Sequence, residues 1–377
     1  MILFLHHRYR TTGGEERAVD DLMWLVRTHL GADAELLERD SRAVGRRRAA
    51  AGVLRGGLDP DEVARAVRRT KARILHAHNL HPTFGWRALA AARGAGARVV
   101  LHLHQYRLVC AIGICFRDGE DCTRCHGRNT LPGVRLNCRG SVPEALAYGA
   151  GLALWQRRMA AQADAFVVPS RFAQGRLRDL GAPVASSFVV AHPMRELAAV
   201  PAPAPGGYAL ITSRLVPEKG IDVAIEACRI AGIALVIAGE GPERERLERS
   251  LRTAVSAGPE VRFVGHVPAA ELPRLRRGAA LALVPSRVAE NLPMAAAEAL
   301  AAGLPVAASR VGGVPELVPD EWLTPPGDAA RLAAAITRIL DDPSAGARAL
   351  AQARTVTAPE RVAPALAAVY EHAAARR

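Results

Sequence analysis

Short apolar segments recur along the chain, and each is followed by a stretch of Ala, Leu and Arg with helical spacing. This alternation predicts β-α-β units that assemble into parallel sheets. The expected strands fall into two series. The first comprises residues 2–6, 34–37, 74–78, 98–102, 165–169 and 188–191, and the second comprises residues 208–213, 234–239, 261–265, 281–285 and 305–309.

A proline-rich segment separates the two series, at residues 200–207. Its prolines exclude helix and ladder pairing, and its final glycines permit sharp turns. A chain of 377 residues is also long enough for two cores. We therefore predict an α/β protein with two Rossmann-like, doubly wound domains, 1–200 and 201–360. A final helix, at residues 361–377 beyond a break at Pro359, is expected to pack back on the first domain.

The sequence contains no stretch approaching the roughly 18–20 consecutive apolar residues that span a bilayer. The first apolar run, residues 1–5, is followed by His6, His7 and Arg8. It has no basic segment before it and no small-residue cleavage site, so it is interpreted as a buried strand rather than a signal peptide. These features predict a cytoplasmic protein.

The net charge of +13 is concentrated in the first half of the chain. Residues 1–190 contain 29 Lys and Arg against 17 Asp and Glu, whereas residues 191–377 contain 21 against 20. This asymmetry is typical of proteins that bind nucleic acid, an anionic membrane surface or an anionic substrate. The alternative is a solvated, arginine-rich surface, since only Lys71 and Lys219 are lysines. Aromatic residues make up only 4% of the chain, which argues against single-strand binding by base stacking.

Two cations, Arg214 and Lys219, follow the first strand of the second series. Ligands of doubly wound folds bind at the carboxyl ends of strands, where an arginine fork and a lysine point charge suit phosphate oxygens. Two exposed surface charges are the alternative. The next strand ends in the segment 239–242, Gly-Glu-Gly-Pro, whose glycines either let the backbone approach a ligand or only turn the chain.

An acidic residue, Glu290, lies in the loop after the strand at 281–285. A helix is expected to begin at about Asn291, with Pro293 in its first turn, and its free amides would bind a diphosphate. Glu298 lies on this helix among Ala, Met and Leu, where a carboxylate requires a partner. A structural salt bridge to Arg214 or Arg287 is the alternative to a ligand role.

The pair Glu290 and Glu298 resembles the Glu-x7-Glu signature of family 4 of the retaining GT-B glycosyltransferases. The segments at 214–219 and 239–242 occur in the order that this family has them. The resemblance implies a GT-B fold, in which two Rossmann-like domains face each other across a cleft. It also implies metal-independent transfer of a sugar, with retention, from a UDP- or GDP-sugar to a saccharide, lipid-linked or natural-product acceptor.

The resemblance also implies roles for individual residues. Arg214 and Lys219 would hold the donor diphosphate, Glu290 would contact hydroxyls of the transferred sugar, and Glu298 would bind the ribose. The expected catalytic residues are Arg214, Lys219, Glu290 and His104. The other expected donor-binding residues are Gly14, Gly239, Gly265, Asn291, Leu292, Pro293 and Met294.

In the first half, Gly13 and Gly14 open a helix with an acidic first turn, where the family places a loop against the donor phosphates and acceptor. His104 ends a strand at the place where the family has a histidine that contacts the donor sugar. Gln105 departs from the family pattern, which commonly has Asp or Asn there, so a carboxylate partner is not expected. The segment 76–79, His-Ala-His-Asn, ends the preceding strand in a similar way.

Five of the six cysteines fall in one loop, at roughly residues 105–143. In a cytoplasmic protein this pattern does not predict disulfides, whereas a Cys-x2-Cys pair flanked by single cysteines suits a tetrahedral zinc site. A subset of the family has this arrangement. The expected ligands of a structural zinc ion are Cys110, Cys122, Cys125 and Cys138, which leaves Cys115 over. Reduced buried thiols and redox pairs are the alternatives.

Two other functional classes remain open at this stage. A nucleotide-sugar epimerase or hydrolase could use the same fold without an acceptor. A basic, zinc-containing nucleic-acid-binding protein is the second alternative, although nucleic acid is not the expected partner. The basic first half favours an anionic or lipid-linked saccharide acceptor, and with it peripheral contact with an anionic inner membrane surface.

Overall fold

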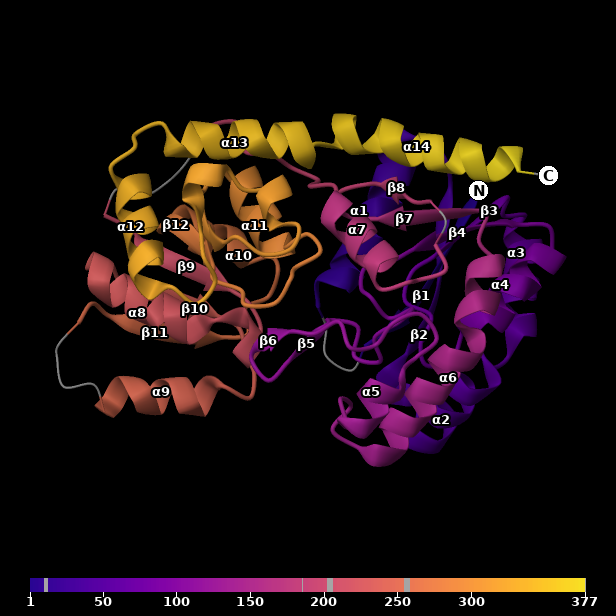
Figure 1. Ribbon diagram of the computed structural model, residues 1–377. Helices are drawn as coiled ribbons and strands as arrows, with labels where there is room; N and C mark the ends of the chain where they lie inside the picture. Colours follow the sequence, from indigo (N-terminus) through magenta and orange to yellow (C-terminus); the bar gives the residue numbers. More distant parts are fainter. Residues whose placement is uncertain (10–12, 185, 202–205, 254–257, 377) are drawn as a thin grey trace. The chain divides into compact units, whose positions relative to one another are not determined.

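The computed structural model describes residues 1–9, 13–184, 186–201, 206–253 and 258–376. They form two compact units (Figure 1). The first unit comprises Met1–Arg117, Cys122–Arg195 and Pro359–Arg377, and the second comprises Asp118–Asp121 and Glu196–Ala358. Each unit is built on one six-stranded parallel sheet, which agrees with the α/β class expected from the sequence.

The sheet of the first unit has the strand order β2-β1-β3-β4-β7-β8. Its strands are β1 (Ile2–Arg8), β2 (Ala34–Asp40), β3 (Ile74–Ala77), β4 (Arg98–His102), β7 (Ala165–Val168) and β8 (Phe188–Val189). Its α-helices are α1 (Gly14–His29), α2 (Arg46–Arg55), α3 (Pro60–Thr70), α4 (Gly85–Gly94), α5 (Leu131–Arg135), α6 (Val142–Ala161), α7 (Arg171–Asp179) and α14 (Pro359–Ala375).

Alternation along β1 explains why the first unit has two apolar layers. Leu3 and Leu5 pack in one buried cluster, while Ile2 and Phe4 pack in another on the opposite face. A parallel strand that is covered on both faces is expected to be apolar throughout, as this strand is. Helix α14 contributes Leu366 to the second cluster, so the last helix of the chain is part of the core of the first unit.

The sheet of the second unit has the order β11-β10-β9-β12-β13-β14. Its strands are β9 (Tyr208–Thr212), β10 (Leu235–Ala238), β11 (Val261–Gly265), β12 (Ala279–Val284), β13 (Val306–Ser309) and β14 (Leu323–Thr324). Its α-helices are α8 (Ile221–Ala231), α9 (Arg244–Thr253), α10 (Leu272–Arg277), α11 (Met294–Ala301), α12 (Ala329–Leu340) and α13 (Ala345–Val356). This strand order reverses between β9 and β12, and such a reversal marks the ligand crevice of doubly wound sheets.

Two helix starts differ from the expectation. Helix α11 begins at Met294 rather than at about Asn291, because Pro293 is an extended N-cap, with φ −71° and ψ 114°, and a proline also holds the residue before it out of the helical region. Helix α14 begins at Pro359 itself, a position that the fixed φ of proline suits. The cysteine-rich loop contains α5 and a short hairpin, β5 (Phe116–Arg117) with β6 (Glu120–Asp121), which were not expected. No helix in the described part of the chain has the length and apolar character needed to cross a bilayer.

Candidate active site

The loops after β9 and β12 lie where the strand order of the second unit reverses, and they bring two predicted residues together. Lys219 ends a short 3-10 helix, η2 (Pro217–Lys219), and its Nζ lies 2.5 Å from Oε1 of Glu290. The hydroxyl of Ser286 donates to the same carboxylate oxygen at 2.6 Å. The side chains of Lys219 and Glu290 are 21% and 14% exposed. The carboxylate is thus held from two sides and is reached by little solvent.

The charge state of Glu290 follows from these neighbours. Burial alone would raise its pKa, but the Lys219 ammonium, hydrogen bonds from Lys219 and Ser286, and the charge of Arg214 together hold the pKa below its ordinary value. Glu290 is therefore ionised at neutral pH. An ionised carboxylate accepts hydrogen bonds only, which suits ligand hydroxyl groups.

Backbone contacts fix the two loops against each other. The amide of Arg287 donates to the carbonyl oxygen of Glu218 at 2.8 Å, and the amide of Gly313 donates to that of Glu290 at 2.7 Å. Gly312 has a φ of +60°, and a Cβ there would lie 2.1 Å from the Glu290 carbonyl oxygen. Ser286 and Gly312 were not identified from the sequence. The Gly-Gly pair two residues beyond the end of β13 was the available signal for Gly312.

The two glycines after β10 have a packing role. A Cβ on Gly239 would lie 1.8 Å from the carbonyl oxygen of Ser213, and one on Gly241 would lie 2.2 Å from that of Leu215. The backbone of the loop that carries Arg214 therefore packs directly against the backbone of these two glycines. Gly265 ends β11 with a φ of +73° and accepts a hydrogen bond from the Gly239 amide at 2.7 Å.

Glu298 on α11 has an ion-pair partner that was not expected. Its carboxylate pairs with Arg276 on α10, and both side chains are 10% exposed. Arg287, which was considered as a partner, instead makes a two-pronged pair with Asp222 at 2.8 and 2.9 Å. Residues 291–293 connect Glu290 to the start of α11. The positive end of that helix dipole therefore lies on the same loop as Glu290.

In the first unit, the predicted Gly14 is the first residue of α1. Gly13 is the N-cap, and Glu16 reaches back to accept a hydrogen bond from the Gly13 amide at 2.8 Å and one from the Tyr9 amide at 3.3 Å. Burial raises the pKa of Glu16, but the nearby His6 ring, 4.0 Å away, and hydrogen bonds from backbone amides outweigh it and leave the pKa lowered. This capping box positions the glycine turn.

His104 follows β4 and lies in a stack of imidazoles. Its ring centroid lies 4.1 Å from that of His102 and 5.5 Å from that of His192, and its Nε2 is 2.8 Å from Nδ1 of His78. Burial, with the neighbouring histidines, lowers the pKa of His104 well below its ordinary value. His104 is therefore neutral at neutral pH, and its ring can form hydrogen bonds but carries no charge.

A cavity beside His104 is lined by polar groups of β1, α1, β3 and β4. Gln105 donates to the Tyr9 hydroxyl at 2.5 Å and also to Glu15. Burial raises the pKa of Glu15. The polar lining residues are Tyr9, Glu15, His78, Asn79, His81, His102, His104, Gln105 and Arg107.

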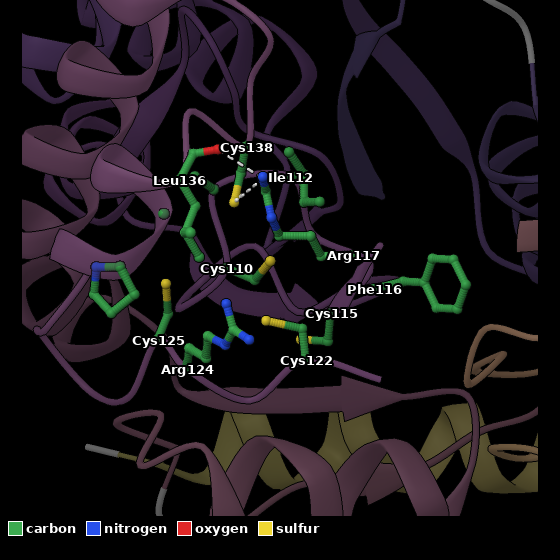
Figure 2. A pocket seen from close by; sticks show the side chains of 13 residues that line it. Cys110, Ile112, Cys115, Phe116, Arg117, Cys122, Arg124, Cys125, Leu136 and Cys138 are labelled. Carbon is green, nitrogen blue, oxygen red and sulfur yellow. Dashed lines mark hydrogen bonds between the residues drawn. The ribbon is translucent and has the colours of Figure 1, made fainter. Parts of the chain in front are cut away.

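A second cavity of the first unit is lined by five cysteines, and Figure 2 shows their side chains around it. Cys115 is one of the five, together with the four predicted zinc ligands. A hydrogen bond with Cys115 is the main cause that lowers the pKa of Cys110 to about 6, whereas burial raises that of Cys125 to about 11. Within the described residues, these sulfur atoms do not form a group of three that lie within 4.8 Å of one another. The thiols gather as expected but are not arranged for coordination.

Two family models match the chain. The model described as "Glycosyl transferase 4-like domain" matches residues 9–192, and "Glycosyl transferases group 1" matches residues 197–356. The first match includes every strand of the first sheet except β1, and the second match includes every strand of the second sheet. Together they cover most of the chain.

Similar curated proteins include the amylovoran biosynthesis glycosyltransferase AmsK of Erwinia amylovora, 40% identical over 146 residues, which are 34% of this chain and 35% of that protein. Another is the 2-deoxystreptamine glucosyltransferase of Streptomyces kanamyceticus, 36% identical over 155 residues, or 38% of each protein. The matched region thus spans little more than a third of these relatives.

Two solved structures share the fold. Anabaena HepE in complex with UDP and glucose has a TM-score of 0.65 and 17% identity, covering 98% of this chain and 99% of that one. Sucrose-phosphate synthase from Thermosynechococcus elongatus has a TM-score of 0.69 and 18% identity, covering 98% of each chain. These similarities show that the two-sheet fold is shared.

Proposed function

The chain belongs to the group 1 glycosyltransferases, family 4, with the GT-B fold, and on this premise we propose that it transfers a hexosyl group, with retention, from a UDP- or GDP-sugar to a saccharide acceptor. The observation that carries the proposal is the Lys219–Glu290 pair at the strand-order reversal of the second unit. A cation there suits a diphosphate, and an ionised carboxylate beside it suits sugar hydroxyls.

In the proposed reaction, the bond between the anomeric carbon and the diphosphate breaks through an oxocarbenium-like transition state. The leaving phosphate gains negative charge as the sugar becomes cationic. Arg214, Lys219 and the N-terminus of α11 would stabilise the leaving charge without a metal ion. Glu290 would hold the transferred sugar, and the departing phosphate would help to deprotonate the acceptor on the same face.

The remaining predicted residues have proposed roles in donor binding. Glu298 would bind the ribose hydroxyls, and its pairing with Arg276 would orient its carboxylate. The loop residues 291–294 and the glycines Gly14, Gly239 and Gly265 would contact the phosphates or the base. Neutral His104 would donate or accept one hydrogen bond with the transferred sugar.

We also propose that the cysteine cavity holds a structural zinc ion. Its expected ligands are Cys110, Cys122, Cys125 and Cys138, which line one cavity, and the low pKa of Cys110 supports a thiolate at neutral pH. Binding would require the sulfurs to draw closer. Four thiolate ligands would leave no open position for catalysis.

A lipid-linked acceptor at an anionic membrane is the proposed partner of the first unit. Along α6, Val142, Leu146 and Leu154 are 57%, 53% and 51% exposed, and their spacing places them on one helix face. Helix α2 lies against α6, since Trp155 donates to the Leu54 carbonyl oxygen at 2.9 Å, and Figure 1 shows α2, α5 and α6 gathered together. The exposed arginines of α2 are Arg46, Arg47, Arg48 and Arg55. Exposed apolar side chains on one helix, with exposed arginines on the neighbouring helix, suit an anionic lipid surface.

The proposed donor site is tested by a thermal-shift panel of UDP, GDP, dTDP and ADP in buffer that contains EDTA. A nucleotide at about 100 times its dissociation constant stabilises the folded chain by roughly 2.7 kcal/mol. We expect one nucleotide to raise the melting temperature of the wild type and of Lys71→Asn, but not of Lys219→Ala. Lys71→Asn is the matched control, since Lys71 is the only other lysine and asparagine tolerates its positive φ.

Two outcomes would contradict the proposal. If a nucleotide stabilises Lys219→Ala as much as the wild type, Lys219 does not bind the donor phosphates. Release of free sugar from the donor at an unchanged rate with and without any acceptor would favour the hydrolase alternative.

A further inference from the structure

Four histidines lie on one face of two paired strands of the first unit. The parallel register places His76 of β3 beside Val100 of β4, so the next pair on the same face is His78 with His102. Ring centroids are 4.4 Å apart for His76 and His78, 5.4 Å for His76 and His102, and 5.2 Å for His78 and His102. His104 stacks on the outer side of His102.

The ring nitrogens of three of these histidines are only partly paired. Nδ1 of His76 is 2.9 Å from the hydroxyl of Tyr370, and Nδ1 of His78 is 2.8 Å from Nε2 of His104. Nε2 of His76, Nε2 of His78 and both nitrogens of His102 have no hydrogen-bond partner. The three residues are 0%, 3% and 1% exposed, so water does not reach most of their surface. Buried polar atoms normally have partners, and these need one.

The nitrogens also converge. His76, His78 and His102 each offer a ring nitrogen, and these three atoms lie within 4.8 Å of one another. The corresponding separation in a tetrahedral zinc site, with Zn–N distances of about 2.0–2.1 Å, is somewhat over 3 Å, so small ring rotations complete the approach. A neutral imidazole binds a metal ion through its unprotonated ring nitrogen.

We propose that His76, His78 and His102 form a binding site for one divalent transition-metal ion of the zinc type. Imidazole ligands select such ions over calcium or magnesium, which prefer oxygen. His78 and His102 also line the polar cavity beside His104, which offers an ion a route to these rings. The carboxyl group of Glu15 lines the same cavity.

The surroundings match those of metal-bound histidines, whose second nitrogen is usually held by a hydrogen bond. Tyr370 holds Nδ1 of His76, and His104 holds Nδ1 of His78. If the metal ion binds Nε2 of His78, Nδ1 of His78 carries a proton and donates it in a hydrogen bond to Nε2 of His104. Neutral His104 then carries its own proton on its Nδ1. The metal site thus fixes the tautomer of a residue proposed to contact the sugar, and it binds no substrate itself.

The test is a cobalt titration of chelator-treated full-length protein, followed by absorption spectroscopy and metal analysis. We expect one Co²⁺ equivalent with visible d–d bands of a nitrogen site, separate from any equivalent that the cysteine cavity binds with the intense near-ultraviolet bands of thiolate ligands. His102→Leu and His102→Gln should each weaken this binding by at least about 100-fold, whereas the exposed control His29→Gln should leave it unchanged.

Two results would overturn the proposal. One is the absence of bound cobalt in the wild type, which is decisive even if the His102 variants fail to fold. The other is cobalt that shows only thiolate bands and persists in both His102 variants, because such an ion belongs to the cysteine cavity. The nucleotide thermal-shift panel, carried out in EDTA, does not depend on this site, so its failure is distinguishable from failure of the metal site.

Discussion

The Nζ atom of Lys219 lies 2.5 Å from Oε1 of Glu290, although the two residues are 71 positions apart and follow different strands. In the proposed donor complex, a diphosphate would compete with Glu290 for this ammonium group. The pair therefore holds a phosphate-binding cation and a hydroxyl-binding carboxylate in place before the donor arrives. Preorganised charge of this kind is the main source of transition-state stabilisation in many enzymes.

Glu290→Gln tests the carboxylate of this pair. The amide keeps the size of the side chain but loses the charge that balances Lys219 and Arg214. We expect kcat to fall by about 10²–10³-fold, while nucleotide binding changes little. Steady-state kinetics with the donor identified by thermal shift, together with nucleotide titration, measure both quantities. Retention of more than about half of the wild-type kcat would exclude contact between Glu290 and the reacting sugar.

Glu298→Gln tests the ribose role against a purely structural one. Loss of the charge leaves Arg276 without its partner in a buried position, so some loss of stability is expected in either case. A ribose role predicts weaker binding of the nucleoside diphosphate, by about tenfold, and unchanged binding of inorganic pyrophosphate. Calorimetric titration of both ligands gives the comparison. Equal weakening of the two would assign Glu298 to the Arg276 pair alone.

Stability is expected to decrease as the pH falls below about 6.5. Burial lowers the pKa of His7 to about 4 and that of His81 to about 3, whereas both titrate near 6.5 in the unfolded chain. Below pH 6.5 the unfolded state therefore binds more protons than the folded state, and each group costs up to about 1.4 kcal/mol per pH unit. The loss continues until the pH passes the folded pKa values.

Urea unfolding at pH 7.5, 6.5, 5.5 and 4.5 measures this loss. His7→Gln should flatten the pH dependence by about one proton, and the exposed His29→Gln should not. Glu290 has the opposite kind of shift, a lowered carboxyl pKa, so its contribution is present above its ordinary value of 4.5 and is lost only below it. An unfolding free energy that stays constant from pH 7.5 to 5.5 would contradict the neutral, buried state of these histidines.

The exposed stripe of α6 predicts membrane binding. Leu146→Ser combined with Leu154→Ser should reduce sedimentation with vesicles of phosphatidylcholine and phosphatidylglycerol several-fold, because apolar area and arginine attraction act together. Leu340→Ser, at an exposed leucine on α12 of the second unit, is the matched control. Binding should also weaken as salt is raised. Sedimentation that is equal for the double variant and the wild type would place the contact elsewhere.

The sequence predicted the two series of strands well, because strands of a parallel sheet are short, apolar and separated by periodic helices. The family resemblance assigned Lys219 and Glu290 separate roles in one donor site, and their ion pair was not predicted. The partner of Glu298 was not predictable, because Arg276 has no pattern that distinguishes it from other arginines. The glycine pair after β10 could not be separated from a ligand loop, since only the coordinates show that Ser213 and Leu215 occupy the space of a Cβ.

The grouping of the four histidines of β3 and β4 could also be predicted only in part. Period two along one strand aligned His102 with His104, but the approach of His76 and His78 depends on the register between β3 and β4. The start of α11 is set by the conformation of one residue, the extended N-cap Pro293. Pro293 ended the extended segment, and the helix could begin only after it.

The place of α14 in the first unit has a consequence for biosynthesis. This helix follows the whole second unit in the chain, yet Leu366 and Val369 complete an apolar layer that strands near the N-terminus began. During translation, the second unit therefore emerges before the first can close its core. Until α14 leaves the ribosome, the strands β3, β4, β7 and β8 that it contacts lack this cover, and the nascent first unit exposes apolar surface of the kind that makes folding intermediates prone to aggregation.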